Sequence, residues 1–239
     1  MNIGRFFCPC CGQTHSGFKA GGSKSRILAE LQVVGGGYRT GRKCPICSCF
    51  DRERLVYLFL ASLETIFKNK LILHIAPERH VRILLECDNP SGYFSGSLRF
   101  RPNTPRMDIT KISHDSNYFD LIVCNHVLEH IQDDRTAMGE LYRVLKPGGL
   151  AILQVPISSK IKDSYEDSQM NTAELRLQAF GQRDHVRIYA KDDYVARLES
   201  KGFVVEMLDF SQTKGLSFAM RHGINSEEEL YLGRKSNNS

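Results

Sequence analysis

The sequence predicts an α/β fold with a doubly wound, mostly parallel sheet, preceded by a small cysteine-rich module. The first observation is a strand–helix–strand unit at Tyr118–Pro156, in which Phe119–Cys124 and Leu150–Val155 are apolar runs of strand length. The second is another apolar run, Leu71–Ala76, which has the composition of a buried parallel strand. The third is the crowding of six of the eight cysteines into the first 49 residues.

Length and composition allow one medium-sized domain and one small module. The chain has 239 residues, of which 41% are hydrophobic and 25% charged, as in ordinary globular proteins. We divide it into a module at residues 1–50 and a main domain at residues 51–239. No apolar run approaches the ~18 residues of a membrane-spanning helix, and the first residues lack the apolar core of a signal peptide. We therefore expect a cytoplasmic protein, whose net charge of +5 suits an anionic substrate.

The cysteines of residues 1–50 form two short pairs with a C-P-x-C spacing. Such a turn points two thiolates at one metal ion, and two turns complete the tetrahedron of a structural zinc site. We predict a zinc-ribbon-like module whose ligands are Cys8, Cys11, Cys44 and Cys47. Cys10 and Cys49 could replace one of these ligands. The alternative is a set of reduced, buried cysteines that hold no metal.

The first half of the main domain reads as alternating helices and strands. Asp51–Lys68 has a broad apolar face and is a helix candidate that packs on the sheet. After the strand Leu71–Ala76, Pro77 suits the first turn of a helix that runs to Cys87. Tyr93–Leu98 and Met107–Ile109 are the next two strand candidates.

The unit at Tyr118–Pro156 predicts where a ligand would bind. Met138, Leu141 and Leu145 recur at helical spacing, and the Pro-Gly-Gly of residues 147–149 stops the helix. Two parallel strands joined by a helix place their carboxyl ends at one edge of the sheet, which is where α/β proteins bind ligands. Asn125 and His126 follow directly after the first strand, so we expect them to lie over a site.

These residues also carry a family resemblance. FDLIVCNHVLEH followed by ELYRVLKPGGLAILQVP resembles the region around the fourth and fifth strands of class I S-adenosylmethionine-dependent methyltransferases. Over nearly its whole length, the chain is similar to a subgroup of type 11-like members with an L-H-x-A-P-E loop and an N-terminal cysteine cluster. The resemblance implies a seven-stranded Rossmann-like sheet in which residues 227–234 form the antiparallel strand, and S-adenosylmethionine as cofactor.

The resemblance also implies a set of cofactor-binding residues. Where the family has a glycine-rich loop after its first strand, this chain has His-Ile-Ala-Pro-Glu at residues 74–78. Ser97 stands where an acidic residue usually bonds the ribose, and Asp108 would lie beside the adenine unless it only caps a turn. The complete predicted set is His74, Ile75, Ala76, Glu78, Ser97, Leu98, Asp108, Ile109, Asn125, His126 and Leu128.

The segment His126–His130 also reads H-x-x-E-H, which is the pattern of inverted zinc proteases. On a helix, the two histidines would share a face and bind zinc, with Glu129 as the base. We favour the methyltransferase interpretation because the segment follows an apolar strand and a KPGG turn lies downstream. In that interpretation His130 borders the substrate side.

Polar groups after Pro156 predict the substrate end of the site. Residues 157–169 are polar and should form a lid or pocket wall that carries Glu166. The string FGQRDHVRIY at residues 180–189 is dense in directional polar groups, and we predict His185 as a general base with Arg183 or Arg187 as an anion clamp. The predicted catalytic residues are His185, His130 and Glu166. The alternative for this string is a surface loop with internal salt bridges.

Three functions are compatible with these patterns. The first is methyl transfer to a small molecule or to a glycan or lipid-linked intermediate, with zinc only structural. The second is an RNA methyltransferase in which the module grips nucleic acid, which we do not favour because Asn125 is followed by histidine and not by proline. The third is a catalytically silent protein that keeps the cofactor-binding fold. The sequence identifies neither the acceptor nor the oligomeric state.

Overall fold

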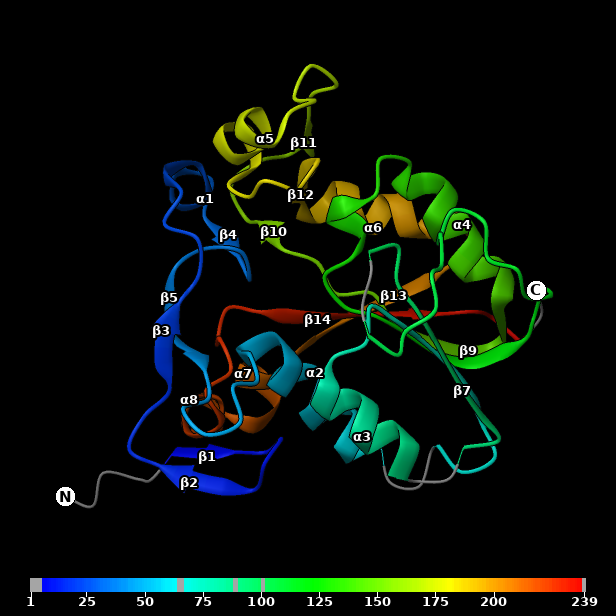
Figure 1. The fold of residues 1–239 in the computed structure, drawn as a ribbon, viewed down its shortest axis with the longest axis horizontal. Coiled ribbons are helices and arrows are strands. Elements are labelled where there is room, and N and C mark those ends of the chain that lie inside the picture. Colours follow the sequence, from blue (N-terminus) through cyan, green and yellow to red (C-terminus); the bar gives the residue numbers. More distant parts are fainter. Residues whose placement is uncertain (1–5, 64–66, 88–89, 100–101, 238–239) are drawn as a thin grey trace.

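The computed structural model describes residues 6–63, 67–87, 90–99 and 102–237, and Figure 1 shows their arrangement. At the centre of the molecule, the described strands form a sheet in the order β13-β14-β9-β8-β6-β7. The bounds of these strands are β6 Leu71–Ile75, β7 Gly92–Gly96, β8 Phe119–Cys124, β9 Leu145–Ile152, β13 Val204–Asp209 and β14 Glu229–Arg234. β7, β6, β8 and β9 are mutually parallel, whereas β14 runs antiparallel to both β9 and β13.

Helices cover both faces of this sheet (Figure 1). Side chains of α4 and α6 share one apolar core with the sheet, and those of α2, α3, α7 and α8 share another on the opposite face. The bounds are α2 Asp51–Ser62, α3 Arg79–Cys87, α4 Asp134–Val144, α6 Lys191–Glu199, α7 Phe210–Lys214 and α8 Leu216–His222. The sheet is therefore doubly wound, as predicted.

The topological switch point of the sheet, at which the strand order reverses, lies between β6 and β8. β7 lies on one side of β6, and the later strands β8 and β9 lie on the other. In the register of the sheet, Ile75 at the end of β6 faces both Gly96 at the end of β7 and Cys124 at the end of β8. The loops that follow these three strands thus start from one edge, which positions a binding site in this fold.

The seventh strand position, beyond β7, holds only a short contact. Ser97 and Arg106 form a parallel bridge, and the Ser97 carbonyl accepts from the Met107 amide at 3.1 Å. A side chain at Gly96 would collide with Met107, whose Cβ would lie 2.3 Å away, so glycine permits this close approach. The strand expected at residues 107–109 is reduced to this bridge because the chain turns at Asp108.

The N-terminal region lies along one side of the molecule, and its strands are short (Figure 1). Its elements are β1 Phe6–Cys8, β2 Gln13–His15, β3 Lys19–Gly21, α1 Arg26–Glu30, β4 Val33–Val34 and β5 Arg39–Lys43. β4 joins a second sheet, in the order β11-β12-β10-β4, with segments that follow β9. The remaining elements are the 3-10 helix η1 Leu128–His130, β10 Ile157–Ser158, β11 Tyr165–Glu166, α5 Ala173–Phe180 and β12 Arg187–Ala190. The predicted domain boundary at residue 50 is therefore crossed by strand pairing.

Element ends differ from the expectations more than element types do. β8 matches its predicted bounds, whereas α2 ends at Ser62; part of the predicted remainder, at residues 64–66, lies outside the described residues. α4 ends at Val144, and β9 begins at Leu145, which already pairs with Phe119 of β8; the register then shifts across the Lys-Pro-Gly-Gly segment before Leu150. Within the described residues, no helix combines the length and the apolar character needed to cross a membrane.

Candidate active site

The loop after β6 approaches the sheet edge without glycine. Ala76 adopts a left-handed conformation with φ of 49°, and its amide donates to the Gly96 carbonyl at 2.7 Å. A non-glycine residue in this conformation carries backbone strain, which proteins concentrate at functional sites. The HIAPE loop thus makes a sharp turn at the carboxyl end of β6 without glycine.

Glu78 links the three strands that end at this edge. Its Oε2 lies 3.0 Å from His74 Nε2, its Oε1 accepts from Asn125 Nδ2 at 2.7 Å, and His74 Nδ1 lies 3.0 Å from the Tyr93 hydroxyl. Burial opposes ionisation of Glu78, but the hydrogen bond and charge of His74, together with Arg52, hold the pKa of this carboxyl below its usual value. Glu78 is therefore a fixed carboxylate at the switch point.

The segment after β8 gathers buried polar atoms without partners. His126 is left-handed at φ 54°, and its amide donates to the Gln154 carbonyl at 2.7 Å. Among the described residues, nothing hydrogen-bonds to Asn125 Oδ1, His126 Nε2 or either carboxylate oxygen of Glu129, and all four atoms are buried. Buried polar atoms of this kind are costly to leave unpaired, so this segment is a candidate ligand site.

Glu129, His130 and His185 come together beside this segment. One donor atom from each lies within 4.8 Å of the others. Burial opposes ionisation of Glu129, but His126 and the charges of His130 and His185 bring the pKa of its carboxyl to about 2. Burial lowers the pKa of His185 to about 4, against the attraction of Glu129. At neutral pH the cluster therefore contains an ionised carboxylate beside a neutral His185 imidazole.

Two backbone and side-chain contacts hold His185 in this place. The Val186 amide donates to the Glu129 carbonyl at 3.0 Å. Arg187 donates from Nη1 to the carbonyls of Leu128, at 3.1 Å, and Ile131, and from Nη2 to Gln132, at 2.8 Å. Its prediction as an anion clamp is wrong because these carbonyls and Glu166 occupy its donors.

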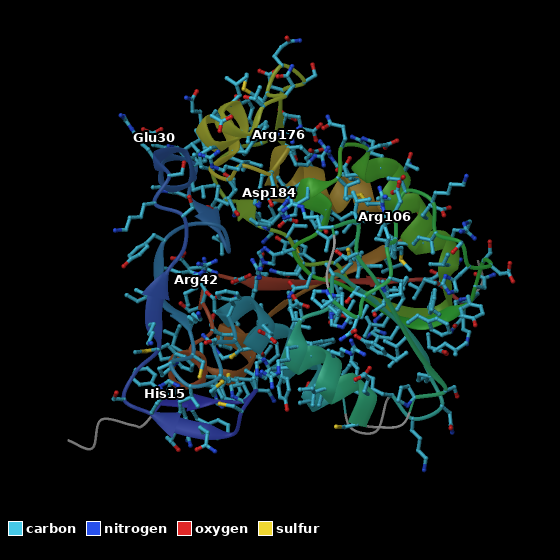
Figure 2. All side chains as sticks on the ribbon, viewed as in Figure 1. His15, Glu30, Arg42, Arg106, Arg176 and Asp184 are labelled. Carbon is cyan, nitrogen blue, oxygen red and sulfur yellow. The ribbon has the colours of Figure 1, made fainter. Side chains whose placement is uncertain are left out.

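Glu166, the third predicted catalytic residue, and Arg183, the other candidate for the anion clamp, lie apart from this cluster. Glu166, on β11, pairs with Arg187 at 3.0 Å and with Arg197. Arg183 pairs with Glu174 on the surface at 2.5 Å. Asp184 orients His130, because its carbonyl oxygen lies 3.1 Å from His130 Nδ1; Figure 2 labels Asp184 in the upper part of the molecule, below Arg176. The structure thus unites His130 and His185 and leaves Glu166 in a structural ion-pair network.

The predicted cofactor residues differ in how far they are buried. His74, Ile75, Ser97, Asn125, His126 and Leu128 are buried at the edge or just below it. Leu98 is 48% exposed, and Ile109 is buried. Asp108 is exposed and caps a turn, since its Oδ1 accepts from both the amide and the hydroxyl of Thr110. Those hydrogen bonds lower the pKa of Asp108.

Arg52 is a charged residue of this edge that the sequence analysis did not assign. It lies in the first turn of α2, and its charge acts on both Glu78 and His126. Its buried Nε has no hydrogen-bond partner among the described residues. A cationic donor beside the switch point suits a carboxylate ligand. The sequence signal that could have identified Arg52 was its place in the first turn of the helix that precedes β6.

The H-x-x-E-H pattern does not form the helical pair of a zinc protease. His126 lies outside η1 in a left-handed conformation, so it and His130 do not share a helix face. His126 Nδ1 instead lies 3.3 Å from Glu129 Oε1, and its Nε2 lies 3.8 Å from Glu228 Oε1. Burial and Arg52 oppose protonation of His126, but the two glutamates outweigh them and raise its pKa.

The N-terminal cysteines form a second cluster, whose four closest sulfurs lie within 4.8 Å of one another. They belong to Cys8, Cys44, Cys47 and Cys49. The Cys8 and Cys47 sulfurs are 3.7 Å apart, close to the ~3.8 Å expected between two thiolates on a tetrahedral zinc ion. The Ile46 amide donates to Cys44 Sγ at 3.4 Å. Cys49 thus takes the position that the sequence analysis gave to Cys11, and this set fits zinc.

Comparison with known proteins matches the central part of the chain. Residues 71–153 match the family model described as a methyltransferase domain. A demethylmenaquinone methyltransferase from Streptomyces avermitilis is 33% identical over 72 residues, which are 29% of this chain and 31% of that protein. The chain thus spans under a third of the length of this curated relative.

Solved structures share the fold at low identity. A Mesorhizobium loti S-adenosylmethionine-dependent methyltransferase is 16% identical, with a TM-score of 0.52 over 75% of this chain and 97% of that one. An Archaeoglobus fulgidus S-adenosylmethionine-dependent methyltransferase is 11% identical, with a TM-score of 0.50 over 77% and 94%. A chain from the complex that contains the Haloferax volcanii Trm112 methyltransferase activator is 12% identical, with a TM-score of 0.51 over 78% and 90%.

The matched segment contains the HIAPE loop and the turn after β8, which lie at the switch point, and the KPGG segment, which lies at the opposite end of the sheet in β9. The sheet order and the helices on both faces are those of the fold that the solved structures share. Residues 71–153 thus match a methyltransferase domain, and the chain carries a cysteine cluster at its N-terminal end.

Proposed function

We propose that this protein transfers the methyl group of S-adenosylmethionine to a small molecule or to a glycan or lipid-linked intermediate. The observation that carries the proposal is the set of buried, unpartnered polar atoms of Asn125, His126 and Glu129 at the carboxyl edge of a methyltransferase sheet. The cofactor brings a methyl group on a positively charged sulfur. The protein's part is to hold this group in line with the acceptor atom, and such alignment can contribute roughly 7–11 kcal/mol to lowering the barrier.

The residues at the switch point fit this cofactor. Glu78 and Asn125 Oδ1 offer acceptors for its ammonium and hydroxyl groups, and Arg52 offers a cation to its carboxylate. The left-handed turn at Ala76 brings the backbone close to the edge, as glycine does elsewhere in the family. Ser97 remains our candidate for the ribose and Ile109 for the adenine.

A polar groove supports a small or glycan acceptor. A cavity of about 910 Å³ lies between the N-terminal region and the loop before β14, and its lining includes Lys24, Arg26 and Arg39. A smaller cavity of about 250 Å³ shares Val34 with it and reaches Glu228, which lies 3.8 Å from His126. The cations of the larger cavity suit a polar molecule that carries a negative charge, whereas Glu228 and Glu229 make the smaller cavity acidic.

His185 is our candidate for accepting a proton from the acceptor, where that atom is a hydroxyl. Glu129 supports this role because its negative charge favours the protonated imidazole. Replacing His185 with Ala should reduce turnover about 100-fold or more, the usual contribution of a general base, and should leave cofactor binding unchanged. Unchanged turnover would refute the assignment.

The experiment that tests the function is a calorimetric titration with S-adenosylhomocysteine. We expect saturable binding with one site per chain. Lack of binding at millimolar ligand would exclude methyl transfer. Labelled methyl transfer into fractionated cell extract then identifies the acceptor, and label in RNA would favour the nucleic-acid alternative.

A further inference from the structure

We propose that Glu129, His130 and His185 form a binding site for one divalent transition-metal cation, separate from the cysteine cluster. Two imidazoles and one carboxylate are the ligand set that first-row divalent ions take with open positions remaining for other ligands. The donor atoms of the three residues lie within 4.8 Å of one another. The binding itself does not depend on the proposed function, and only its use in methyl transfer rests on that function.

Among the described residues, the buried carboxylate of Glu129 lacks the hydrogen-bond donors that a buried carboxylate normally has. The residue is 1% exposed, and no described group donates a hydrogen bond to either of its oxygens. Oε1 lies 3.3 Å from His126 Nδ1 and 3.8 Å from His130 Nε2, which are ion-pair distances. An ionised carboxylate out of water is strongly destabilising unless a cation or several donors satisfy it. A cation would complete this environment.

His130 is held with the correct nitrogen free. Its Nδ1 lies 3.1 Å from the Asp184 carbonyl oxygen, which can only accept, so Nδ1 carries the proton. Nε2 is then the ring nitrogen on the side of Glu129, 3.8 Å from its Oε1. Metal-bound histidines are oriented in this manner by a carbonyl or carboxylate on the far nitrogen. Asp184 Oδ2, at 3.4 Å from the same Nδ1, adds a negative charge behind the ring and is itself paired with Arg99.

The spacing of the donor atoms must contract to hold an ion. Two ligand atoms about 2.1 Å from one cation lie about 3.0–3.4 Å apart at octahedral or tetrahedral angles. The 3.8 Å between His130 Nε2 and Glu129 Oε1 is a few tenths of an ångström wider. The ring centroids of His130 and His185 are 4.6 Å apart and perpendicular, so each ring can turn its edge to a shared point.

The cluster is built on fixed backbone. The hydrogen bond from the Val186 amide to the Glu129 carbonyl holds the two ligand segments together, and Arg187 bonds the carbonyls on both sides of His130. Three ligands leave coordination positions for water or an acceptor oxygen. A cation there would lower the pKa of a bound acceptor hydroxyl. In this assignment His185 is a ligand and not the base.

Manganese is the probe that separates this site from the cysteine cluster, because Mn²⁺ prefers nitrogen and oxygen ligands whereas thiolates select softer ions. Mn²⁺ is titrated into the full-length protein and free ion is followed by electron paramagnetic resonance. We expect one bound ion per chain, with nitrogen couplings from imidazole in the pulsed spectrum. Glu129→Gln and His130→Ala should each weaken binding at least about ten-fold. Glu174→Gln, an exposed glutamate on α5, should bind as the unaltered protein does.

The outcomes separate the inference from the proposed function. The inference is overturned if no Mn²⁺ binds at millimolar ion, or if both variants bind as tightly as the unaltered protein. If circular dichroism shows that Glu129→Gln is unfolded, His130→Ala decides, because its side chain is already 26% exposed. If the protein binds S-adenosylhomocysteine but does not bind Mn²⁺, only this inference is overturned. If it binds Mn²⁺ but does not bind S-adenosylhomocysteine, only the methyltransferase proposal is overturned.

Discussion

Arg187 is the residue on which the arrangement of the candidate active site most depends. Its side chain is 2% exposed, and its guanidinium joins the turn at Leu128–Gln132 to Glu166 on β11. Asp134, also buried, lies 3.7 Å from the same group. A buried arginine with these partners acts through the residues that it positions, and η1 carries two of them, Glu129 and His130.

Replacing Arg187 with Met should destabilise the fold by about 3–5 kcal/mol, because the carbonyls of Leu128, Ile131 and Gln132 lose their donor in a buried place, although Arg197 still pairs with Asp134. Denaturation in urea, followed by circular dichroism, measures this loss. Arg183→Met is the matched control, since Arg183 and its partner Glu174 are 63% and 68% exposed. We expect that control to keep the midpoint of the unaltered protein. Equal midpoints for both variants would contradict the role given to Arg187.

At this scale the sequence could indicate which residues matter but not how they meet. Asn125, His126 and His130 were identifiable because they follow an apolar strand at the switch point. The proximity of His185 to Glu129 depends on a backbone hydrogen bond from Val186, between segments far apart in the chain. Arg187 was predicted as an anion clamp because sequence alone does not report that its side chain is buried.

Among the elements, the turns after β6 and β8 are the least regular and the most functional. Ala76 and His126 both adopt positive φ values, 49° and 54°, immediately after or close to a buried strand. A left-handed conformation costs a residue with a Cβ roughly 1–2 kcal/mol. Both turns lie at the edge where the cofactor is proposed to bind, so strain and function coincide there.

The substitution Ala76→Gly tests for that strain through the sign of the change in the free energy of unfolding. Glycine removes the steric cost at positive φ but adds freedom to the unfolded chain, worth about 0.4–1 kcal/mol. We expect a change in the free energy of unfolding between zero and about +1 kcal/mol. Ala196→Gly, on the exposed side of α6, should instead lose about 1 kcal/mol because its backbone is helical. Thermal and urea denaturation of the two variants gives the comparison, and equal losses at both positions would argue against strain at Ala76.

Periodic elements were predictable, and the elements set by local turns were not. The apolar run Phe119–Cys124 became β8 without change, because buried strands are short and uniformly apolar. The segment at Met107–Ile109 resembled a strand in composition, but the Asp108 side chain bonds Thr110 and turns the chain. Side-chain hydrogen bonds of this kind compete with strand pairing.

At the scale of the whole molecule, Arg54 joins the cysteine cluster to the main domain. Its side chain is completely buried and bonds four carbonyls, those of Gly41, Cys49, His222 and Gly223. Its Nη1 also lies 3.7 Å from Cys49 Sγ. Hydrogen bonds from the thiols of Cys10 and Cys8, with Arg54 nearby, lower the pKa of Cys49 to about 4. Cys49 thus contacts both the other sulfurs and the arginine that reaches α8.

The cysteine cluster and the main domain should therefore unfold together, and Cys49 should matter more than Cys11. We expect Cys49→Ser to lose zinc by elemental analysis and to lower the melting temperature by several degrees, since each kcal/mol shifts a chain of this size by roughly 2–4 °C. Cys11→Ser should keep one zinc ion per chain, and Cys87→Ser, at an exposed thiol outside the cluster, should change neither quantity.

The same comparison discriminates between the two ligand sets. If Cys11→Ser loses zinc and Cys49→Ser keeps it, the ligand set predicted from the sequence, which contains Cys11, is favoured over the set in the structure, which contains Cys49. Loss in neither would mean that the six N-terminal thiols share the ion and can replace one another. A chelator that removed zinc without moving the melting temperature would separate the cluster from the main domain energetically. That result would contradict the coupling through Arg54, because a side chain with four carbonyl partners in both parts transmits the loss of either.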